Sequence, residues 1–215
     1  MPGRASERLE ELGRRFARLA TRVVVARPGL WRLFRGPLRA QFDHLAPAWE
    51  GRRGPEALAA LAAALDRLEQ APATALDLGT GTGKAARLVA ERFPDCEVVG
   101  VDLAPKMIEQ ARGVLREELA GRVRFDVADA AELPFPDGAF DLVILLNMIP
   151  FFDELARVAA PSATIVVASM FGPETPIYTP FPVLRERFEA RGFERFEELR
   201  VGEGDAFLAR RGERG

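Results

Sequence analysis

The sequence is poor in the residues that build metal centres and disulfides. Its 215 residues include one cysteine, Cys96, and one histidine, His44. An intrachain disulfide and a cysteine- or histidine-rich metal cluster are therefore excluded, and we expect no metal ion. So little cysteine suits a reducing compartment, and we expect a cytoplasmic protein.

Long apolar runs are also missing. No stretch reaches the eighteen or so apolar residues that a membrane-spanning helix needs, and we expect no secretory leader. The net charge of −2 argues against a general affinity for nucleic acid, and we expect no DNA partner. Hydrophobic residues make up 48% of the chain, which is enough for one domain with a sizeable core.

Positive charge is concentrated at the start of the chain. Residues 1–40 contain ten arginines against three glutamates, a net charge of +7 that leaves −9 on the remaining residues. Within residues 6–26, apolar side chains recur every three or four positions, which predicts an amphipathic helix that ends at Pro28-Gly29. The members of this stripe are Leu9, Leu12, Phe16, Leu19 and Val23.

Two interpretations of this helix remain open. In the one we favour, the helix is a cap whose apolar stripe covers the substrate side of the domain while its arginines face water. In the other, residues 1–40 contact an anionic membrane as a basic amphipathic helix. The apolar patch at residues 30–34, which contains Trp31 and precedes a break at Gly36-Pro37, keeps the second interpretation alive.

The most informative stretch is Ala75-Leu76-Asp77-Leu78-Gly79-Thr80-Gly81-Thr82-Gly83-Lys84. An apolar run, an acidic residue, three alternating glycines and a helical pattern predict a buried strand, a tight loop and a helix N-terminus. Glycines let the backbone take positive φ and let a ligand approach the main chain. The helix behind them offers unpaired N–H groups and a partial positive charge, so the turn is suited to the polar end of a nucleotide-like ligand.

Spacing separates the ligand classes that use such a turn. The dinucleotide fingerprint G-x-G-x-x-G would need its third glycine at Lys84. The phosphate loop G-x-x-x-x-G-K-[ST] would need a glycine at Leu78 and a hydroxyl at Ala85. Both patterns fail, and D-x-G-x-G-x-G remains. It resembles the first motif of the class I S-adenosylmethionine-dependent methyltransferases, and the resemblance implies cofactor contacts at Asp77, Gly79, Thr80, Gly81 and Gly83.

The next two predicted strands add the nucleoside end of this site. Asp102 ends the second strand, where a carboxylate can accept both ribose hydroxyls. Dinucleotide-binding proteins share that feature, so Asp102 by itself indicates only a nucleoside. The resemblance further implies that Leu103 and Met107 flank the adenine ring, that Asp129 accepts from its amino group, and that Ala130 offers a nearby backbone N–H.

A second signature follows at residues 133–141, which read L-P-F-x-D-x-x-F-D. This pattern resembles adenosylmethionine enzymes that act on small molecules. Asn147 ends the next predicted strand, where open α/β sheets bind ligands, and we include it among the cofactor-binding residues. Enzymes that methylate nucleic-acid amines place Asn-Pro-Pro-aromatic here. Met148 and Ile149 replace the prolines, which argues against DNA and favours an apolar acceptor.

Candidates for catalysis are few. Residues 42–50 resemble the segment that precedes the core of quinone-ring and other small-molecule methyltransferases, where it closes over the cofactor and acceptor. His44 in this segment could act as a general base near neutral pH, although a lone histidine is more often a surface residue. Asp43, Asn147 and Tyr178 are weaker candidates, and we assign no catalytic residue.

Alternating strands and helices predict the architecture. The fold class is α/β, with a mostly parallel sheet covered on both faces, and the resemblance implies a Rossmann-like class I methyltransferase fold with seven strands, the last antiparallel, and an N-terminal helical extension. We expect an extension over residues 1–70 and a cofactor-binding domain over 71–215. The predicted strands are 74–78, 97–102, 123–127, 140–146, 164–169, 193–201 and 206–210. The predicted helices are 55–70, 83–93, 105–119, 153–159 and 183–191, with a proline-rich loop at 170–182.

The sequence thus predicts an S-adenosylmethionine-dependent methyltransferase that modifies carbon or oxygen of a small, apolar or aromatic metabolite. One alternative is a protein that binds the cofactor or S-adenosylhomocysteine without catalysis. A weaker one is an RNA methyltransferase whose arginine-rich helix contacts phosphates. The sequence leaves the acceptor, the oligomeric state and the role of residues 1–40 open.

Overall fold

The protein is built around one seven-stranded sheet with the strand order β3-β2-β1-β4-β5-β7-β6. The computed structural model describes residues 4–52 and 55–211. Only β7 runs antiparallel to its neighbours β5 and β6, so the predicted mostly parallel sheet is confirmed. The strands are β1 (Thr74–Leu78), β2 (Glu97–Asp102), β3 (Val123–Val127), β4 (Phe140–Leu146), β5 (Ala159–Ser169), β6 (Phe193–Val201) and β7 (Gly204–Arg211).

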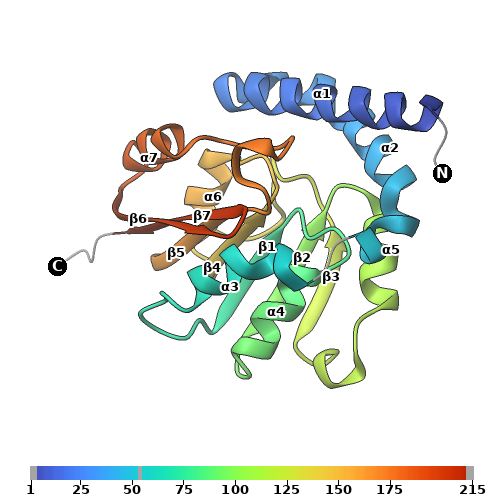
Figure 1. Cartoon of the computed structure of the whole chain (residues 1–215). Coiled ribbons are helices and arrows are strands. Elements are labelled where there is room, and N and C mark those ends of the chain that lie inside the picture. Colours follow the sequence, from blue (N-terminus) through green and yellow to red (C-terminus); the bar gives the residue numbers. More distant parts are fainter. Residues whose placement is uncertain (1–3, 53–54, 212–215) are drawn as a thin grey trace.

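Helices cover both faces of the sheet (Figure 1). They are α3 (Ala59–Leu65), α4 (Lys84–Arg92), α5 (Pro105–Gly113), α6 (Phe152–Val158) and α7 (Phe181–Glu189). Successive side chains of a strand point to opposite faces, so β1 sends Ala75 into one core cluster and Leu76 into the other. Residues of α3, α4 and α5 fill the first cluster, and residues of α6 and α7 fill the second.

Two further helices, α1 (Arg4–Ala26) and α2 (Trp31–Trp49), form the N-terminal extension. Figure 1 shows α1 across the top of the molecule and α2 descending from it to α5. The predicted break at Pro28-Gly29 is a 3₁₀ turn (Pro28–Leu30), but the predicted break at Gly36-Pro37 is wrong because α2 continues through Pro37 and Pro47. Both prolines are exposed, so water can bind the carbonyl groups that lose their helical partner.

The predicted apolar stripe of α1 is wrong in its register. Ala17, Ala20 and Val24 are buried, whereas Leu12 is 62% and Leu19 is 55% exposed. Small residues let α1 pack closely against the rest of the molecule, and the leucines are left at the outer surface. Phe16 and Val23 are half-buried between the two sides, and the side chain of Leu9 lies outside the described part.

Other differences concern the ends of elements. The predicted helix 55–70 is a 3₁₀ turn (Pro55–Leu58) followed by α3, and α5 ends at Gly113 before a separate 3₁₀ turn (Glu117–Leu119). β5 begins at Ala159, directly after α6, and passes through Pro161 with a register shift against β4. Shorter 3₁₀ turns lie at Glu50–Arg52 and at Gly172–Glu174.

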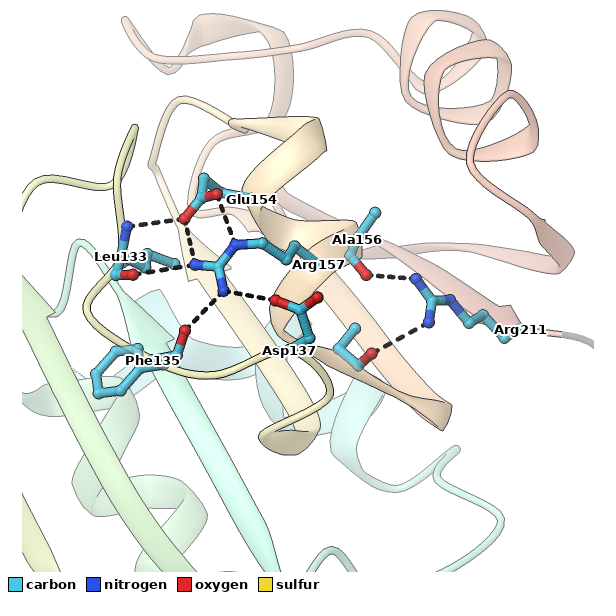
Figure 2. A network of polar contacts seen from close by, with 8 residues as sticks. Leu133, Phe135, Asp137, Glu154, Ala156, Arg157 and Arg211 are labelled. Atoms are coloured by element: carbon cyan, nitrogen blue, oxygen red, sulfur yellow. Dashed lines mark hydrogen bonds and ion pairs between the residues drawn. The ribbon is translucent and has the colours of Figure 1, made fainter.

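Arg157 of α6 holds the loop that carries the L-P-F-x-D pattern (Figure 2). Its guanidinium group donates to the carbonyl oxygens of Leu133 at 3.0 Å and Phe135 at 2.6 Å. It also pairs with the carboxylates of Asp137 at 3.0 Å and Glu154 at 2.7 Å. Glu154 in turn accepts from the Leu133 N–H at 2.7 Å. The pattern therefore has a structural role in this protein, since it fixes the connection into β4.

We expect Arg157→Lys to lower the free energy of unfolding by about 2 kcal/mol, because an ammonium group cannot replace a planar fork that binds two carbonyls and two carboxylates. Chemical denaturation measures the change. Arg195→Lys is the matched control, because Arg195 makes an exposed ion pair with Glu69 and should change stability by less than about 0.5 kcal/mol. Equal losses in the two variants would contradict this role for Arg157.

Candidate functional site

A cavity of about 620 Å³ opens at the carboxyl ends of β1, β2 and β4. β1 lies between β2 and β4 in the sheet, and the strand order reverses at this point because β2 and β3 lie on one side and β4 and β5 on the other. The cavity lies at this reversal, which is the usual ligand site of open α/β sheets. The helices α1 and α2 supply a further wall, which includes Gly13, Ala17, Trp31, Leu38, Gln41, Phe42, His44, Leu45 and Trp49. Pockets of this volume hold ligands of drug size.

The glycine loop forms one wall of the cavity, and its backbone is left-handed at two glycines. Gly79 and Gly81 have φ values of +74° and +54°, which side chains rarely adopt. A Cβ atom on Gly79 would lie 2.6 Å from Met148 Sδ, and one on Gly81 would lie 3.3 Å from Trp49 Nε1. The N–H groups of Gly79 and Thr80 donate to the Val101 carbonyl at 2.9 Å. These bonds tie the loop to the end of β2.

Gly83 has a different role from the other two glycines. It does not line the described cavity, and a Cβ atom there would lie 2.5 Å from Phe125 Cζ. Its φ of +80° starts α4, and its N–H donates to the Thr80 carbonyl at 2.8 Å. Gly83 thus shapes the turn and leaves room for the Phe125 ring, and its contact with a cofactor stays a prediction.

Asp77 lies beneath the loop with one oxygen unsatisfied. Its Oδ2 accepts from the Thr80 hydroxyl at 2.5 Å and from the Ala86 N–H at 3.0 Å. Its Oδ1 is buried and has no hydrogen-bond partner among the described residues. Burial raises the pKa of Asp77 to about 7, although both hydrogen bonds act in the opposite direction. The side chain lines the cavity, so a cationic donor there would satisfy the free oxygen.

Asp102 organises the neighbouring wall at the end of β2. Its carboxylate accepts from the Gly81 N–H at 2.9 Å and from the Ala104 N–H at 2.8 Å. Burial raises its pKa above the ordinary value, against these two bonds. Leu103, Ala104 and Met107 line the cavity beside it, and the predicted contact of Leu103 and Met107 with adenine stays a prediction.

Asp129 lies away from the cavity lining. It accepts from the Trp31 indole N–H at 2.7 Å and from the Ala131 N–H at 3.0 Å, and it pairs with Arg35 at 3.4 Å. The carboxylate therefore anchors α2, and its predicted contact with adenine stays a prediction. Ala130 does line the cavity.

Asn147 turns the chain sharply at the end of β4. It has a φ of +54°, the only positive value at a non-glycine residue in the described part of the chain, and asparagine tolerates this conformation better than most residues. Its Oδ1 accepts from the Met170 N–H at 3.0 Å. The turn directs Met148 to the glycine loop, and both residues line the cavity.

The catalytic candidates are dispersed. His44 is exposed and lines the cavity, whereas Asp43 accepts from the Lys106 N–H at 3.0 Å at the start of α5. Tyr178 is absent from the cavity lining and donates to Asp205 at 3.2 Å, and burial raises its pKa to about 12. In 4–52 and 55–211 there is no cluster of His, Cys, Asp or Glu side chains that could hold a metal ion.

The sequence did not predict that one continuous helix, α2, walls the cavity, although the resemblance implied that residues 42–50 close over the cofactor and acceptor. Leu38, Phe42, Leu45 and Trp49 recur every three or four positions and line the cavity. This periodicity is a helix signal, but Pro37 and Pro47 argue against a helix when local rules alone are applied. Met170, Pro176 and Ile177 complete the apolar side and come from the predicted proline-rich loop 170–182 that follows β5.

Residues 75–166 match the family of methyltransferase domains. The chain is 50% identical over 108 residues to a demethylmenaquinone methyltransferase of Thermus thermophilus, covering 46% of this chain and 48% of that protein. It is 38% identical over 112 residues to an ajmaline N-methyltransferase of Rauvolfia serpentina, covering 48% and 38% respectively. The chain thus spans half or less of the length of these two relatives.

Among solved structures, a SAM-dependent methyltransferase from Aquifex aeolicus superposes with a TM-score of 0.62. The superposition covers 80% of this chain and 97% of that one at 19% sequence identity. At this identity the likeness establishes the shared fold, including the sheet whose reversal point carries the cavity.

Proposed function

Because the chain belongs to the class I S-adenosylmethionine-dependent methyltransferases, we propose that it transfers a methyl group to carbon or oxygen of a small, apolar or aromatic metabolite. The observation that carries the proposal is the buried, unpartnered Oδ1 of Asp77 at the wall of a cavity that extends well beyond the glycine loop. A cofactor with an ammonium group at one end and a reactive group further along fits this arrangement.

The residues of the cofactor half fit S-adenosylmethionine. Asp77 offers an acceptor to the methionine ammonium group, and Thr82 adds a second buried hydroxyl without a partner among the described residues. Asp102 could keep its two N–H contacts and also accept from ribose hydroxyls, since a carboxylate has about four acceptor sites. Leu103 and Met107 offer apolar surface to the base.

The other half of the cavity suits an apolar acceptor. Its walls include Ala17, Leu38, Ile149, Met170 and Ile177. The carboxylates that line the described cavity are Asp77 and Asp102, both in the cofactor half. An acceptor half without a carboxylate offers no ion pair to a cationic amine, and this favours a neutral or electron-rich ring.

The cofactor, when bound, supplies a methyl group on a sulfonium that is already an activated leaving group. The chain's own residues then hold the two reactants in line and exclude water. The helices α1 and α2 perform the second task, since they wall the cavity opposite the sheet. A base is needed only for an acceptor that is still protonated. His44 of α2, which lines the cavity, could serve as that base.

A second candidate, a cofactor-binding protein without catalysis, would need a blocked acceptor half. Phe151 and Phe152 are buried in the core, and neither they nor Phe171 line the described cavity. This favours the enzyme. RNA methylation would make RNA binding depend on residues 1–40 and on salt concentration.

Calorimetric titration with S-adenosylhomocysteine, and separately with NADH, tests the cofactor assignment. We expect the wild type to bind S-adenosylhomocysteine and Asp102→Ala to bind it on the order of 30-fold more weakly, because two charge-assisted hydrogen bonds are lost. Asp153→Ala is the control, since that carboxylate is exposed and pairs with Arg191. Binding of NADH in place of S-adenosylhomocysteine would overturn the proposed function.

We also propose a cytoplasmic protein in which residues 1–40 contact a membrane surface. No helix of residues 4–52 and 55–211 is long and apolar enough to cross a bilayer. Contact with a membrane surface is supported by the excess of arginines in this segment and by its exposed leucines.

A further inference from the structure

We infer that one outward side of the N-terminal extension docks on an anionic lipid bilayer and brings the cavity to the bilayer surface. We call this side the leucine–arginine face, defined by Leu12, Leu19 and Leu33 with Arg15, Arg22 and Arg32. The docking proposal depends only on the exposed side chains of α1 and α2. Its use, the delivery of an apolar acceptor, rests on the proposed function.

The three leucines are the most exposed large apolar side chains in the described part of the chain. Leu12, Leu19 and Leu33 are 62%, 55% and 63% exposed. Leu12 and Leu19 are seven residues apart, so they lie on the same side of α1 two turns apart. Leu33 lies in the first turn of α2, next to Phe34, whose ring lies 5.8 Å from that of Phe16 on α1.

The burial pattern of α1 is the reverse of that of an ordinary surface helix. The inner side includes the small residues Gly13, Ala17, Ala20 and Thr21 together with Val24, and Phe16 is half-buried, whereas Leu12 and Leu19 face outward. A helix that only had to cover the domain would bury its largest apolar residues. Their outward position indicates that they meet a second apolar medium.

Positive charge accompanies the leucines. Arg15 and Arg22 follow Leu12 and Leu19 by three residues, which places each arginine one turn further along the same side. Arg22 and Arg32 are exposed and form no ion pair among the described residues, and Arg15 pairs only with the exposed Glu11 of its own helix. Exposed leucines flanked by arginines are typical of helices that bind the surface of an anionic bilayer.

The opposite side of the same helix borders the cavity. Gly13, Arg14 and Ala17 line it, while Leu12 and Leu19 face outward. The thickness of one helix therefore separates the proposed bilayer contact from the acceptor half. An apolar acceptor dissolved in the bilayer would reach the cavity along the edge of α1 without crossing water.

Vesicle co-sedimentation of the full chain tests the docking. The probes are phosphatidylcholine vesicles with and without phosphatidylglycerol. We expect binding to the anionic vesicles that falls with ionic strength. The combined variant Leu12→Ser, Leu19→Ser and Leu33→Ser should lower the partition coefficient on the order of 100-fold, because three side chains no longer enter the lipid. None of the three lines the cavity.

Val127→Ser is the matched control, since Val127 is 51% exposed but lies on β3, away from the leucine–arginine face. It should bind anionic vesicles within about twofold of the wild type. A charge variant, Arg15→Glu with Arg22→Glu, should lose the preference for phosphatidylglycerol while it keeps its circular dichroism spectrum.

The docking is overturned if the wild type binds neither kind of vesicle, or if the triple serine variant binds as well as the wild type. It is also overturned if light scattering shows a dimer that the triple variant dissociates, because the leucines would then contact a second copy. Titration of the same proteins with S-adenosylhomocysteine separates the two proposals: vesicle binding without cofactor binding would refute the proposed function and leave the docking intact.

Discussion

Replacing Asp77 by asparagine is expected to make the protein more stable and to weaken its binding of S-adenosylhomocysteine on the order of 100-fold. Both effects have one cause. The buried carboxylate has a free Oδ1 that stabilises nothing in the folded chain by itself and would accept from the ammonium group of the ligand. Asparagine keeps one oxygen for Thr80 and Ala86 but presents an N–H group to the cavity.

The gain in stability should depend on pH. Asp77 has a pKa of about 7 in the folded protein against 3.8 for an ordinary aspartate. A raised pKa means that its contribution to stability is fully present below about pH 4 and is lost as the pH rises towards 7. The free energy of unfolding of Asp77→Asn should therefore exceed that of the wild type by on the order of 4 kcal/mol at pH 8, and by less at pH 5.

Binding has the opposite dependence on pH. A cationic ligand favours the ionised carboxylate, so the affinity of the wild type for S-adenosylhomocysteine should rise as the pH increases through 7 and then level off. Asp77→Asn should show no such rise. Denaturation and calorimetric titration at pH 5 to 8 measure both effects, with Asp153→Asn as the surface control. Unchanged affinity in Asp77→Asn would refute the assignment of this residue to the ligand's ammonium group.

Gly83→Ala is expected to destabilise the protein by about 3 kcal/mol, which combines a left-handed backbone penalty with overpacking. The φ of Gly83 is +80°, and the new Cβ atom would lie 2.5 Å from Phe125 Cζ and 2.8 Å from Phe125 Cε1. The same ring also packs closely against Gly100, where an added Cβ atom would lie 2.6 Å from Phe125 Cδ1. The Phe125 ring thus fills space that is open because Gly83 and Gly100 have no side chains.

Chemical denaturation measures this loss, and Gly113→Ala is the control. Gly113 ends α5 and has nothing within 4 Å of an added Cβ atom, so alanine there should leave the stability unchanged or raise it slightly. Adding Phe125→Leu to Gly83→Ala should recover the part due to crowding and leave the part due to the backbone. A loss in Gly83→Ala no larger than in Gly113→Ala would contradict the packing role.

Local pattern was sufficient for much of the sheet. β1 to β4 and β6 have the predicted bounds. β1, β2 and β4 are mainly apolar runs, whereas β3 and β6 mix apolar with charged residues, and β6 is bounded by Gly192 and Gly202. Gly79, Gly81 and Asp102, which follow or end strands, line the cavity, and their contacts with a cofactor stay predictions. Such features depend on residues that are close in the sequence.

The sequence did not indicate the contacts between distant segments. Asp129 is held by Trp31, 98 residues earlier, and no local rule could have indicated that pairing. Proline penalties predicted a break in α2, but the contacts of Phe42, Ala46 and Trp49 with Ala104 and Met107 stabilise a continuous helix. The periodicity of residues 6–26 correctly predicts a helix, but how closely small residues can pack decides which side of α1 faces the domain.

The two tryptophans of the chain, Trp31 and Trp49, both line the cavity, and both belong to α2. Tryptophan fluorescence therefore comes from this site alone, because the rest of the chain contains no tryptophan. One ring is fixed to Asp129 and the other lies over the glycine loop. The protein consequently carries its own optical probe, with which ligand arrival can be followed in real time without any attached label.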